Sequence, residues 1–297
     1  MGSNLLKAVI RDTIPRPLRN WLRSPSKSAQ WFWDAGRFYL GSTETLRFPQ
    51  NWTLICHPRA YRAAYQSQII DPEQREEFQN FLLQCRPGML LLDIGAHFGI
   101  FSLAAAHFGG NAVAIDPSPI ATRMITVQSS LNELSDRIRV IQAAVSAEDG
   151  AVDMLSSGVF SDGYFKIARG RGQKELTRTQ ATTIDQLVSV YGPPTHVKID
   201  VEGQETAVLR GGRKALEQHS PLLFLELHNE MITSEGGDPH LALNELEQLG
   251  YETFSLKGDS LDRDFILQKP LIRVVAVRAQ GRSFAPCGEA GGVPRRS

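Results

Sequence analysis

The chain has 297 residues, 42% of them hydrophobic and 22% charged, a composition typical of a soluble globular protein with a large buried core. The formal net charge of zero argues against a nucleic-acid partner, because proteins that bind nucleic acids usually carry a basic excess. Three scattered cysteines are not the pattern of a disulfide framework, and no apolar leader or membrane-spanning run is evident, so we expect a cytoplasmic protein.

Residues 1–40 are more basic than the rest of the chain. They hold seven Lys or Arg and two acids, a net charge of +5, together with an apolar stripe. The stripe consists of Leu5, Leu6, Val9, Ile10, Leu18, Trp21 and Leu22. We predict a basic amphipathic arm over residues 1–40. Two interpretations stay open: the arm packs on its own domain or a partner subunit, or it makes a weak contact with an anionic membrane surface.

Residues 41–87 are expected to cover the ligand pocket rather than to form an independent domain. The apolar residues of 47–58 predict a strand, and residues 59–68 predict a helix. A second helix is predicted over residues 72–85, because Asp71 can cap it and a proline suits its first position.

The central motif spans residues 89–116, MLLLDIGAHFGIFSLAAAHFGGNAVAID. Its first apolar run predicts a strand buried on both faces, which turns at Gly95 and Gly99 into a helix that ends at residues 109–110. The second apolar run predicts a neighbouring strand that ends at Asp116. We expect the two glycines to let the backbone approach a ligand, and Asp116 to accept hydrogen bonds from both ribose hydroxyls. The motif therefore predicts a nucleoside site.

The kind of nucleoside is indicated by Asp93, which precedes Gly95 by two residues. The loop is not G-x-G-x-x-G, and a carboxylate at the first turn suits a cation better than a pyrophosphate. S-adenosylmethionine carries an ammonium and a sulfonium group, so the sequence favours a methyl-donor site. An NAD site and a purely structural strand, turn and helix are the alternatives.

The following elements alternate as in an α/β protein with a parallel sheet. Ser118 and Pro119 predict the start of a helix that runs to about residue 131. Residues 137–145 predict the third strand, and a hairpin should lead from it into a strand at residues 152–155.

Adenine is expected beyond the second and third strands, near Ala144, where small residues leave room for a ring. Residues 156–181 lack apolar periodicity, so we expect a surface loop or a lid that faces the acceptor. A short helix capped by Thr183 should follow over residues 182–190.

A second motif, THVKIDVEGQETAVLRGGRKAL, spans residues 195–216. A predicted fourth strand precedes Asp200 and Glu202. Because open α/β sheets bind ligands at the carboxyl ends of their strands, these two acids are candidate catalytic residues. In the alternative interpretation they cap the next helix and pair with Arg210 or with Lys198, a buried charge that needs a partner.

Residues 221–227, PLLFLEL, predict a fifth strand, and His228 stands at its end. His228 is a candidate base or ligand, and a structural role as a hydrogen-bonding group is the alternative. Glu226 lies inside this apolar strand, so it either reaches the pocket or is neutralised. A divalent metal held by Asp200, Glu226 and His228 is a further alternative, which we do not favour.

The C-terminal part should close the sheet. A helix is predicted over residues 241–249, and residues 251–256 and 271–277 predict an antiparallel pair of strands. The Gly-, Pro- and Arg-containing residues 281–297 are expected to form a disordered tail. The core domain is therefore predicted to span residues 88–280.

Several motifs stand in the order found in the FkbM family of S-adenosylmethionine-dependent methyltransferases, which this chain resembles over about residues 88–230. The matching segments are LLLDIGAHFGIFSLAA, AIDPSP, QAAVS, TTIDQL, VKIDVEGQETAVLRGG and PLLFLEL. The resemblance implies an α/β fold, the Rossmann-like class I methyltransferase sheet of seven mostly parallel strands with helices on both faces. The chain departs from the family at His97, where asparagine is common, and at Asp116, where glutamate is common.

The resemblance implies that Asp93, Gly95, Ala96 and Gly99 form the loop on the methionine side of the donor. It also implies that Asp116 holds the ribose and that Asp200 and Glu202 flank the donor and the acceptor. The positions of His97, Ala144 and His228 in the sequence add these three residues to the set. The predicted cofactor-binding residues are Asp93, Gly95, Ala96, His97, Gly99, Asp116 and Ala144, and the candidate catalytic residues are Asp200, Glu202 and His228. Such enzymes usually O-methylate sugars, polyketides or other secondary metabolites, so we expect a sugar, glycan or secondary metabolite as acceptor. Its hydroxyl would attack in line while a side chain accepts the proton. An NAD-dependent oxidoreductase and a non-catalytic S-adenosylmethionine-binding protein are the rival functions.

Overall fold

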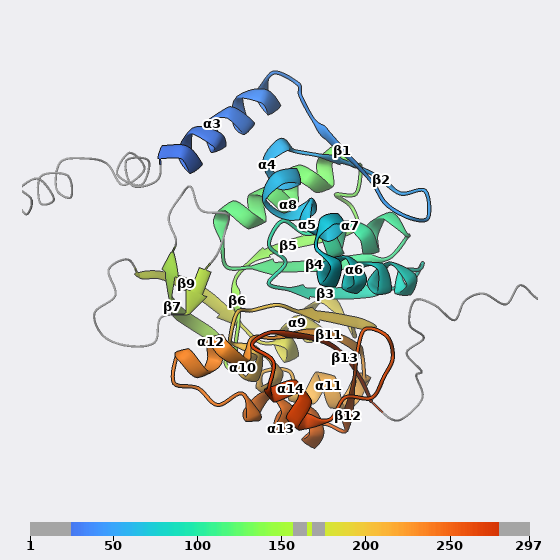
Figure 1. The fold of residues 1–297 in the computed structure, drawn as a ribbon, viewed down its shortest axis with the longest axis vertical. Coiled ribbons are helices and arrows are strands. Elements are labelled where there is room, and N and C mark those ends of the chain that lie inside the picture. The colour runs from blue at the N-terminus through green and yellow to red at the C-terminus, as the bar shows by residue number, and fades with distance from the viewer. Residues whose placement is uncertain (1–24, 157–164, 168–175, 279–297) are drawn as a thin grey trace, which may run out of the picture.

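The computed structural model of the protein describes residues 25–156, 165–167 and 176–278 (Figure 1). The predicted apolar stripe of residues 5–22 and the predicted disordered tail lie outside these ranges, so both stay predictions. Within the described ranges, no helix has the length and the apolar character needed to cross a membrane.

A seven-stranded sheet forms the centre of the molecule and carries the site. Its strand order is β12-β13-β11-β10-β3-β4-β5. Among these seven strands, β13 alone runs in the opposite direction to the other six. The strands are β3 (Leu90–Ile94), β4 (Asn111–Asp116), β5 (Ile138–Gln142), β10 (His196–Ile199), β11 (Leu222–Leu227), β12 (Tyr251–Phe254) and β13 (Ile272–Arg278). The mostly parallel class I methyltransferase sheet, with its antiparallel closing strand, is confirmed.

The sheet is buried on both faces, which explains the nearly continuous apolar runs of its strands. Leu91 and Phe224 belong to the core under one layer of helices, whereas Leu92 and Leu225 belong to the core under the other. The first layer holds α6 (Pro72–Gln84), α7 (Ile100–His107) and α8 (Pro119–Leu131). The second holds α9 (Ile184–Tyr191), α10 (Glu205–Arg210), α11 (Arg213–His219) and α13 (His240–Gln248) (Figure 1). Two short helices, α12 (Asn229–Ser234) and α14 (Arg263–Leu267), follow β11 and precede β13 in the chain.

Three helix starts predicted from capping residues are confirmed. Asp71, Ser118 and Thr183 each accept a hydrogen bond from the backbone N–H three residues further on, at 2.9, 3.2 and 3.0 Å. These caps satisfy amides that the helix itself leaves unpaired, so the local sequence fixes where α6, α8 and α9 begin.

The predicted hairpin after the third strand is wrong, and so is the expectation that residues 156–181 are irregular throughout. A separate sheet has the order β6-β9-β7-β8, in which β6 (Ala144–Val145) pairs in parallel with β9 (Leu176–Thr182). Strand β7 (Gly150–Ser156) pairs antiparallel with β9 and with β8 (Phe165–Ile167). Strand β9 escaped prediction because its few buried positions, Thr179 and Ala181, give little apolar signal, and its partners are distant in sequence.

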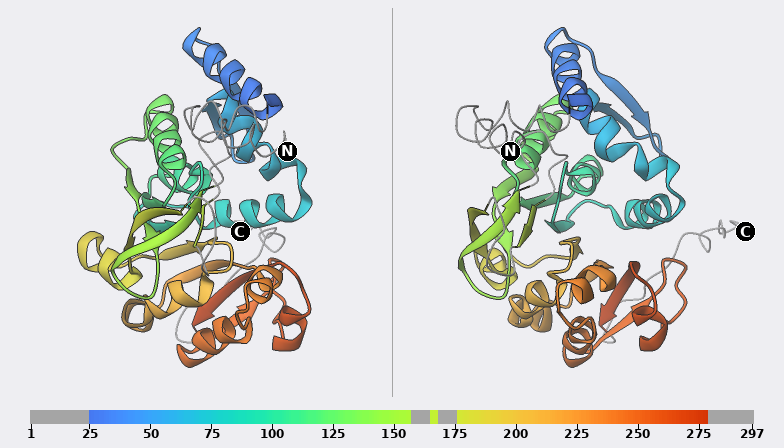
Figure 2. Two further views of the ribbon diagram at one scale, coloured as in Figure 1. Left: turned by 90° about the vertical axis from the view of Figure 1, so that its left-hand side faces the viewer. Right: turned by 60° about the vertical axis from the view of Figure 1, so that its left-hand side comes forward.

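The N-terminal region differs in detail from the prediction. Instead of one strand, β1 (Glu44–Arg47) and β2 (Thr53–Cys56) form an antiparallel hairpin. The predicted helix over residues 59–68 is broken into α4 (Pro58–Ala60), the π-helical η1 (Tyr61–Tyr65) and α5 (Ser67–Ile70). Helix α3 (Pro25–Tyr39) lies at one end of the molecule (Figure 2). The ion pair of Asp34 and Arg62, at 2.6 Å, joins it to η1.

Candidate functional site

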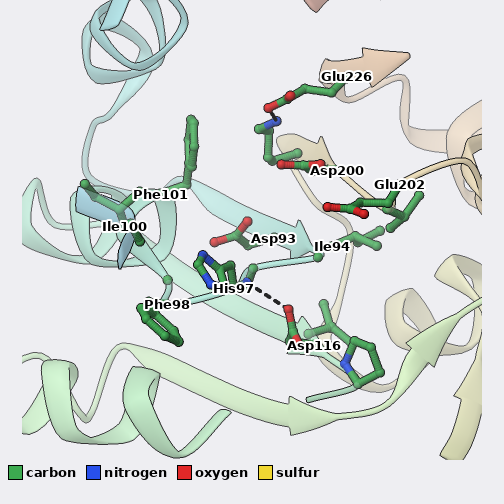
Figure 3. A pocket seen from close by; sticks show the side chains of 18 of the residues that line it. Asp93, Ile94, His97, Phe98, Ile100, Phe101, Asp116, Asp200, Glu202 and Glu226 are labelled. Atoms are coloured by element: carbon green, nitrogen blue, oxygen red, sulfur yellow. Dashed lines mark hydrogen bonds and ion pairs between the residues drawn. The ribbon is translucent and has the colours of Figure 1, made fainter. Parts of the chain in front are cut away.

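A cavity of about 310 Å³ opens at the carboxyl ends of β3, β4, β10 and β11, and its volume suits a small-molecule ligand (Figure 3). All of the site residues predicted from the sequence line it: Asp93, Gly95, Ala96, His97, Gly99, Asp116, Ala144, Asp200, Glu202 and His228. The predicted cover lines it too, through Tyr65, Gln68 and Gln74. The structure therefore brings the predicted donor and acceptor residues together, while their binding roles stay predictions.

The turn after β3 uses its own amides within the fold. The N–H groups of Gly95 and Ala96 both donate to the carbonyl oxygen of Ile115, at 2.9 and 3.0 Å, and the N–H of Gly99 donates to Ala96. A pyrophosphate is held by amides that are left unpaired at such a turn. Because these amides are already bonded, the turn fits the NAD alternative poorly.

The glycines of this turn are also required by close contacts within the protein. A Cβ atom on Gly95 would lie 1.8 Å from the carbonyl oxygen of Asp200, and one on Gly99 would lie 2.9 Å from the side chain of Ile125. Gly95 also has a φ of +78°, which favours glycine. These positions therefore need glycine for contacts within the protein. Both also line the cavity, and a close approach of the ligand to their backbone stays a prediction.

Asp116 is fixed by two backbone amides at the tip of β4. Its Oδ2 accepts from the N–H of His97 at 2.9 Å, and its Oδ1 accepts from the N–H of Ser118 at 2.8 Å (Figure 3). Each carboxylate oxygen can accept more than one hydrogen bond, so both can still receive ligand hydroxyls. Burial raises the pKa of Asp116 to about 7, against the lowering effect of the two amides. The His97 ring itself stacks on Phe98, with the centroids 4.1 Å apart.

Asp93 has a structural role that the sequence did not indicate. Its Oδ2 accepts hydrogen bonds from the N–H and the hydroxyl of Ser102, at 3.1 and 2.6 Å, and so caps the first turn of α7. Burial raises the pKa of Asp93 to about 6, although Ser102 acts to lower it. Asp93 and Asp116 come from the neighbouring strands β3 and β4, so two buried carboxylates line this part of the cavity.

Asp200 and His228 face each other at the tips of β10 and β11. Their Oδ1 and Nε2 atoms are 3.7 Å apart, and the Nδ1 atom of His228 is 2.7 Å from Oε1 of Glu205. Burial alone would lower the pKa of His228, but the hydrogen bond and charge of Glu205, together with Asp200, raise it. Burial and the nearby Glu226 raise the pKa of Asp200. Glu205 was not identified as a site residue from the sequence, although it lies in the second motif together with Asp200 and Glu202.

Glu202 lines the cavity from a tight turn between β10 and α10. Its φ is +49°, and that of the following Gly203 is +97°. A glutamate in this left-handed region is uncommon, and such conformations gather at functional sites. This geometry agrees with the prediction of a site role for Glu202 without assigning the role.

The buried Lys198 has partners other than those proposed from the sequence. Its Nζ lies 2.9 Å from Glu226 and 3.1 Å from Glu77, and Arg273 lies 2.9 Å from the other oxygen of Glu226. Although burial acts to raise it, these two cations hold the pKa of Glu226 well below its usual range. We call Glu77, Lys198, Glu226 and Arg273 the buried ion cluster. It balances the charge of Glu226, and the same residue lines the cavity, so both outcomes predicted for Glu226 are observed together.

The buried ion cluster also argues against the alternative of a metal held by Asp200, Glu226 and His228. Ligand atoms of Asp200, Glu226 and His228 lie within 4.8 Å of one another, close enough to converge on an ion. Both oxygens of Glu226, however, already pair with Lys198 and Arg273, and these cations would repel a divalent metal. The donor set therefore fits a metal poorly, and we build no step on one.

Fold and site together are those of a Rossmann-like α/β protein with a small-molecule pocket at its strand ends. The family described as "Methyltransferase FkbM domain" matches residues 93–253, which is more than half of the chain. The protein belongs to this family.

The individual relatives match only part of this chain, and at low identity. The chain is 29% identical over 140 residues to the 31-O-demethyl-FK506 methyltransferase FkbM of Streptomyces tacrolimicus, covering 46% of this chain and 51% of that one. It is 29% identical over 79 residues to the ribosomal protein L11 methyltransferase of Pelotomaculum thermopropionicum, covering 26% of each. The chain thus spans a quarter to a half of the length of these relatives. A crystal structure of methyltransferase FkbM from Methylobacillus flagellatus KT is similar with a TM-score of 0.43 and 15% identity, covering 64% of this chain and 43% of that one.

Replacing Gly95 by alanine should destabilise the protein more than the same change at Gly88. Both residues have φ near +80°, a conformation that costs a non-glycine residue about 1–2 kcal/mol. Only at Gly95 does the new Cβ meet the Asp200 carbonyl, since no atom lies within 4 Å of a Cβ at Gly88. Urea unfolding of the two variants measures the difference. Equal losses would contradict the close contact between these loops.

Replacing Lys198 by methionine should lower the free energy of unfolding by about 3–5 kcal/mol at neutral pH, because buried acids lose a cation. The pKa values of Glu77 and Glu226 should rise in this variant, so its folded state binds protons and the loss should shrink as the pH falls. Unfolding curves across pH measure this, with Lys214→Met on the exposed surface as the matched control. If Lys198→Met lost no more free energy of unfolding than Lys214→Met, the stabilising role of Lys198 would be refuted.

Proposed function

We propose that the protein is an S-adenosylmethionine-dependent methyltransferase that methylates a hydroxyl of a sugar, glycan or secondary metabolite. The observation that carries the proposal is that a single cavity is lined by Asp93 and Asp116, on the neighbouring strands β3 and β4, and by the imidazole of His228, after β11. Membership of the FkbM domain family supports the reaction class.

The residues present fit the methyl donor. Asp116 is held so that its oxygens can accept from ribose hydroxyls, and Asp93 is placed beside it for the ammonium group. Ala143 and Ala144, both buried, line the cavity past the strand ends and leave room for adenine. When bound, S-adenosylmethionine supplies a methyl group that its sulfonium already activates.

The protein's own task is then to orient the acceptor and to take its proton. The His228 side chain is 13% exposed, enough to reach the cavity while most of the ring is shielded from water. An imidazole with a pKa near the working pH is an effective general base. His228 is therefore our proton acceptor, with Asp200 and Glu202 placed to orient the acceptor hydroxyl.

A protein acceptor is the second candidate, since the L11 relatives are named for methylating a ribosomal protein. Small-molecule acceptors are favoured here by the neutral net charge and by the small volume of the cavity, about 310 Å³. Transfer of labelled methyl groups into a panel of sugars and hydroxylated metabolites, compared with a ribosomal protein fraction, separates the two. Labelling confined to protein would overturn the small-molecule proposal.

The membrane contact of residues 1–40 also stays a proposal. In the described part of this segment, Phe32, Trp33 and Tyr39 of α3 are exposed by 55, 65 and 90%, which supports contact with an apolar or interfacial environment.

Replacing Asp116 by alanine should weaken binding of S-adenosylmethionine about 10- to 100-fold, because hydrogen bonds to a charged group are lost. Titration calorimetry measures the affinity, and thermal unfolding of the free variant shows how much the loss of the His97 and Ser118 contacts disturbs the fold. Asp136→Ala, an exposed acid after α8, is the matched control. Unchanged donor affinity in Asp116→Ala would refute the ribose assignment.

Replacing His228 by alanine should lower turnover about 10²- to 10⁴-fold, the usual contribution of a general base, with little change in donor affinity. Glu202→Gln should shift turnover in the same direction. Methyl transfer is measured by release of S-adenosylhomocysteine, and His219→Ala, on α11 and away from the cavity, is the control. Full activity in His228→Ala would remove this residue from the mechanism.

A further inference from the structure

Glu205 is completely buried at the start of α10, directly behind His228. Its Oε1 atom lies 2.7 Å from Nδ1 of His228 and also accepts from the N–H of Gly203 at 3.0 Å. In the described structure nothing donates to its second oxygen, Oε2. A buried carboxylate with one oxygen unpaired is costly, so a purely structural role explains its presence poorly.

The contact decides which ring nitrogen of His228 carries the proton. A carboxylate oxygen can only accept, so Nδ1 of His228 must donate to Glu205. In the neutral ring the lone pair is then on Nε2, the nitrogen 3.7 Å from Asp200. The second partner of Glu205, the Gly203 amide, ties this arrangement to the strained turn that carries Glu202.

We propose that Glu205 is a positioning residue, which holds the Nδ1–H of His228 so that Nε2 is the atom that accepts the proton of the acceptor hydroxyl. This inference deepens the proposed function and rests on it. As the hydroxyl oxygen bonds to the methyl group, the bond from that methyl group to the donor sulfur breaks and leaves S-adenosylhomocysteine. The hydroxyl O–H bond breaks in the same step, and its proton moves to Nε2. Glu205 keeps its negative charge and stabilises the imidazolium that results.

The titration of His228 should respond to every charged group that faces it. Glu205 faces it from α10, Asp200 from the end of β10 and Glu226 from β11, while Lys198 and Arg273 offset the charge of Glu226. Removing the charge of Glu205 therefore should lower the pKa of His228.

The test is Glu205→Gln, which can keep both hydrogen bonds of Oε1 but removes the charge. We expect the acidic midpoint of the kcat/KM profile to move down by about one pH unit. Turnover at the plateau should fall about tenfold, with donor affinity unchanged. In a His228→Ala background the same substitution should have no further effect on turnover. Glu245→Gln, which removes another buried carboxylate on α13, controls for loss of stability.

A second readout does not depend on turnover. Ring ¹⁵N NMR spectra, with the His228 signals identified by their loss in His228→Ala, should show Nδ1 protonated in the neutral ring. Glu205→Gln should lower the titration midpoint of His228. Glu205→Asp has a shorter side chain, which moves the carboxylate away from the ring, so this variant should weaken the preference for Nδ1–H. A neutral ring protonated on Nε2, or a midpoint unchanged in Glu205→Gln, would overturn the proposal. The NMR measurement does not require methyl transfer. Failure of this inference can therefore be distinguished from failure of the proposed function.

Discussion

The site depends on one close contact between two strand ends. The backbone of Gly95, after β3, lies so near the carbonyl of Asp200, after β10, that no side chain fits between them. The N–H of Asp200 in turn donates to the carbonyl of Ile94 at 3.0 Å. These contacts join the tip of β3, beside β4 and Asp116, to the tip of β10, beside β11 and His228. The spacing between Asp116 and the proposed base is therefore fixed by backbone packing rather than by flexible side chains.

A second constraint joins the N-terminal cover to the sheet. The buried ion cluster links α6, through Glu77, to Lys198 on β10 and to β11 and β13. The hydroxyl of Tyr65, in η1, donates to the carbonyl of Phe98 at 2.5 Å and so ties the cover to the turn after β3. Ion pairs of this kind stabilise little when compared with a well-packed apolar core, but they accept only one arrangement of their partners. They therefore define where the cover lies over the cavity.

The sequence predicted the strands and helix starts that depend on residues close together in the chain. Apolar runs indicated the strands of the central sheet, and the capping residues indicated the starts of α6, α8 and α9, because both signals lie within a few residues. It could not predict interactions between distant side chains. Lys198 clearly needed a partner, but its choice of Glu77, which is 121 positions earlier in the chain, depends on how α6 packs. Glu205 and His228 meet for the same reason, across the ends of two elements.

The acids of the cavity serve the fold and the proposed ligand at once. Asp93 caps α7 and Asp116 fixes two amides, yet burial raises the pKa of both, so their ionised forms are costly. A cationic ligand would lower that cost, because it favours the ionised carboxylates. A phosphate would increase it. The electrostatics and the bonded amides of the turn therefore both disfavour a pyrophosphate, and the two arguments are independent.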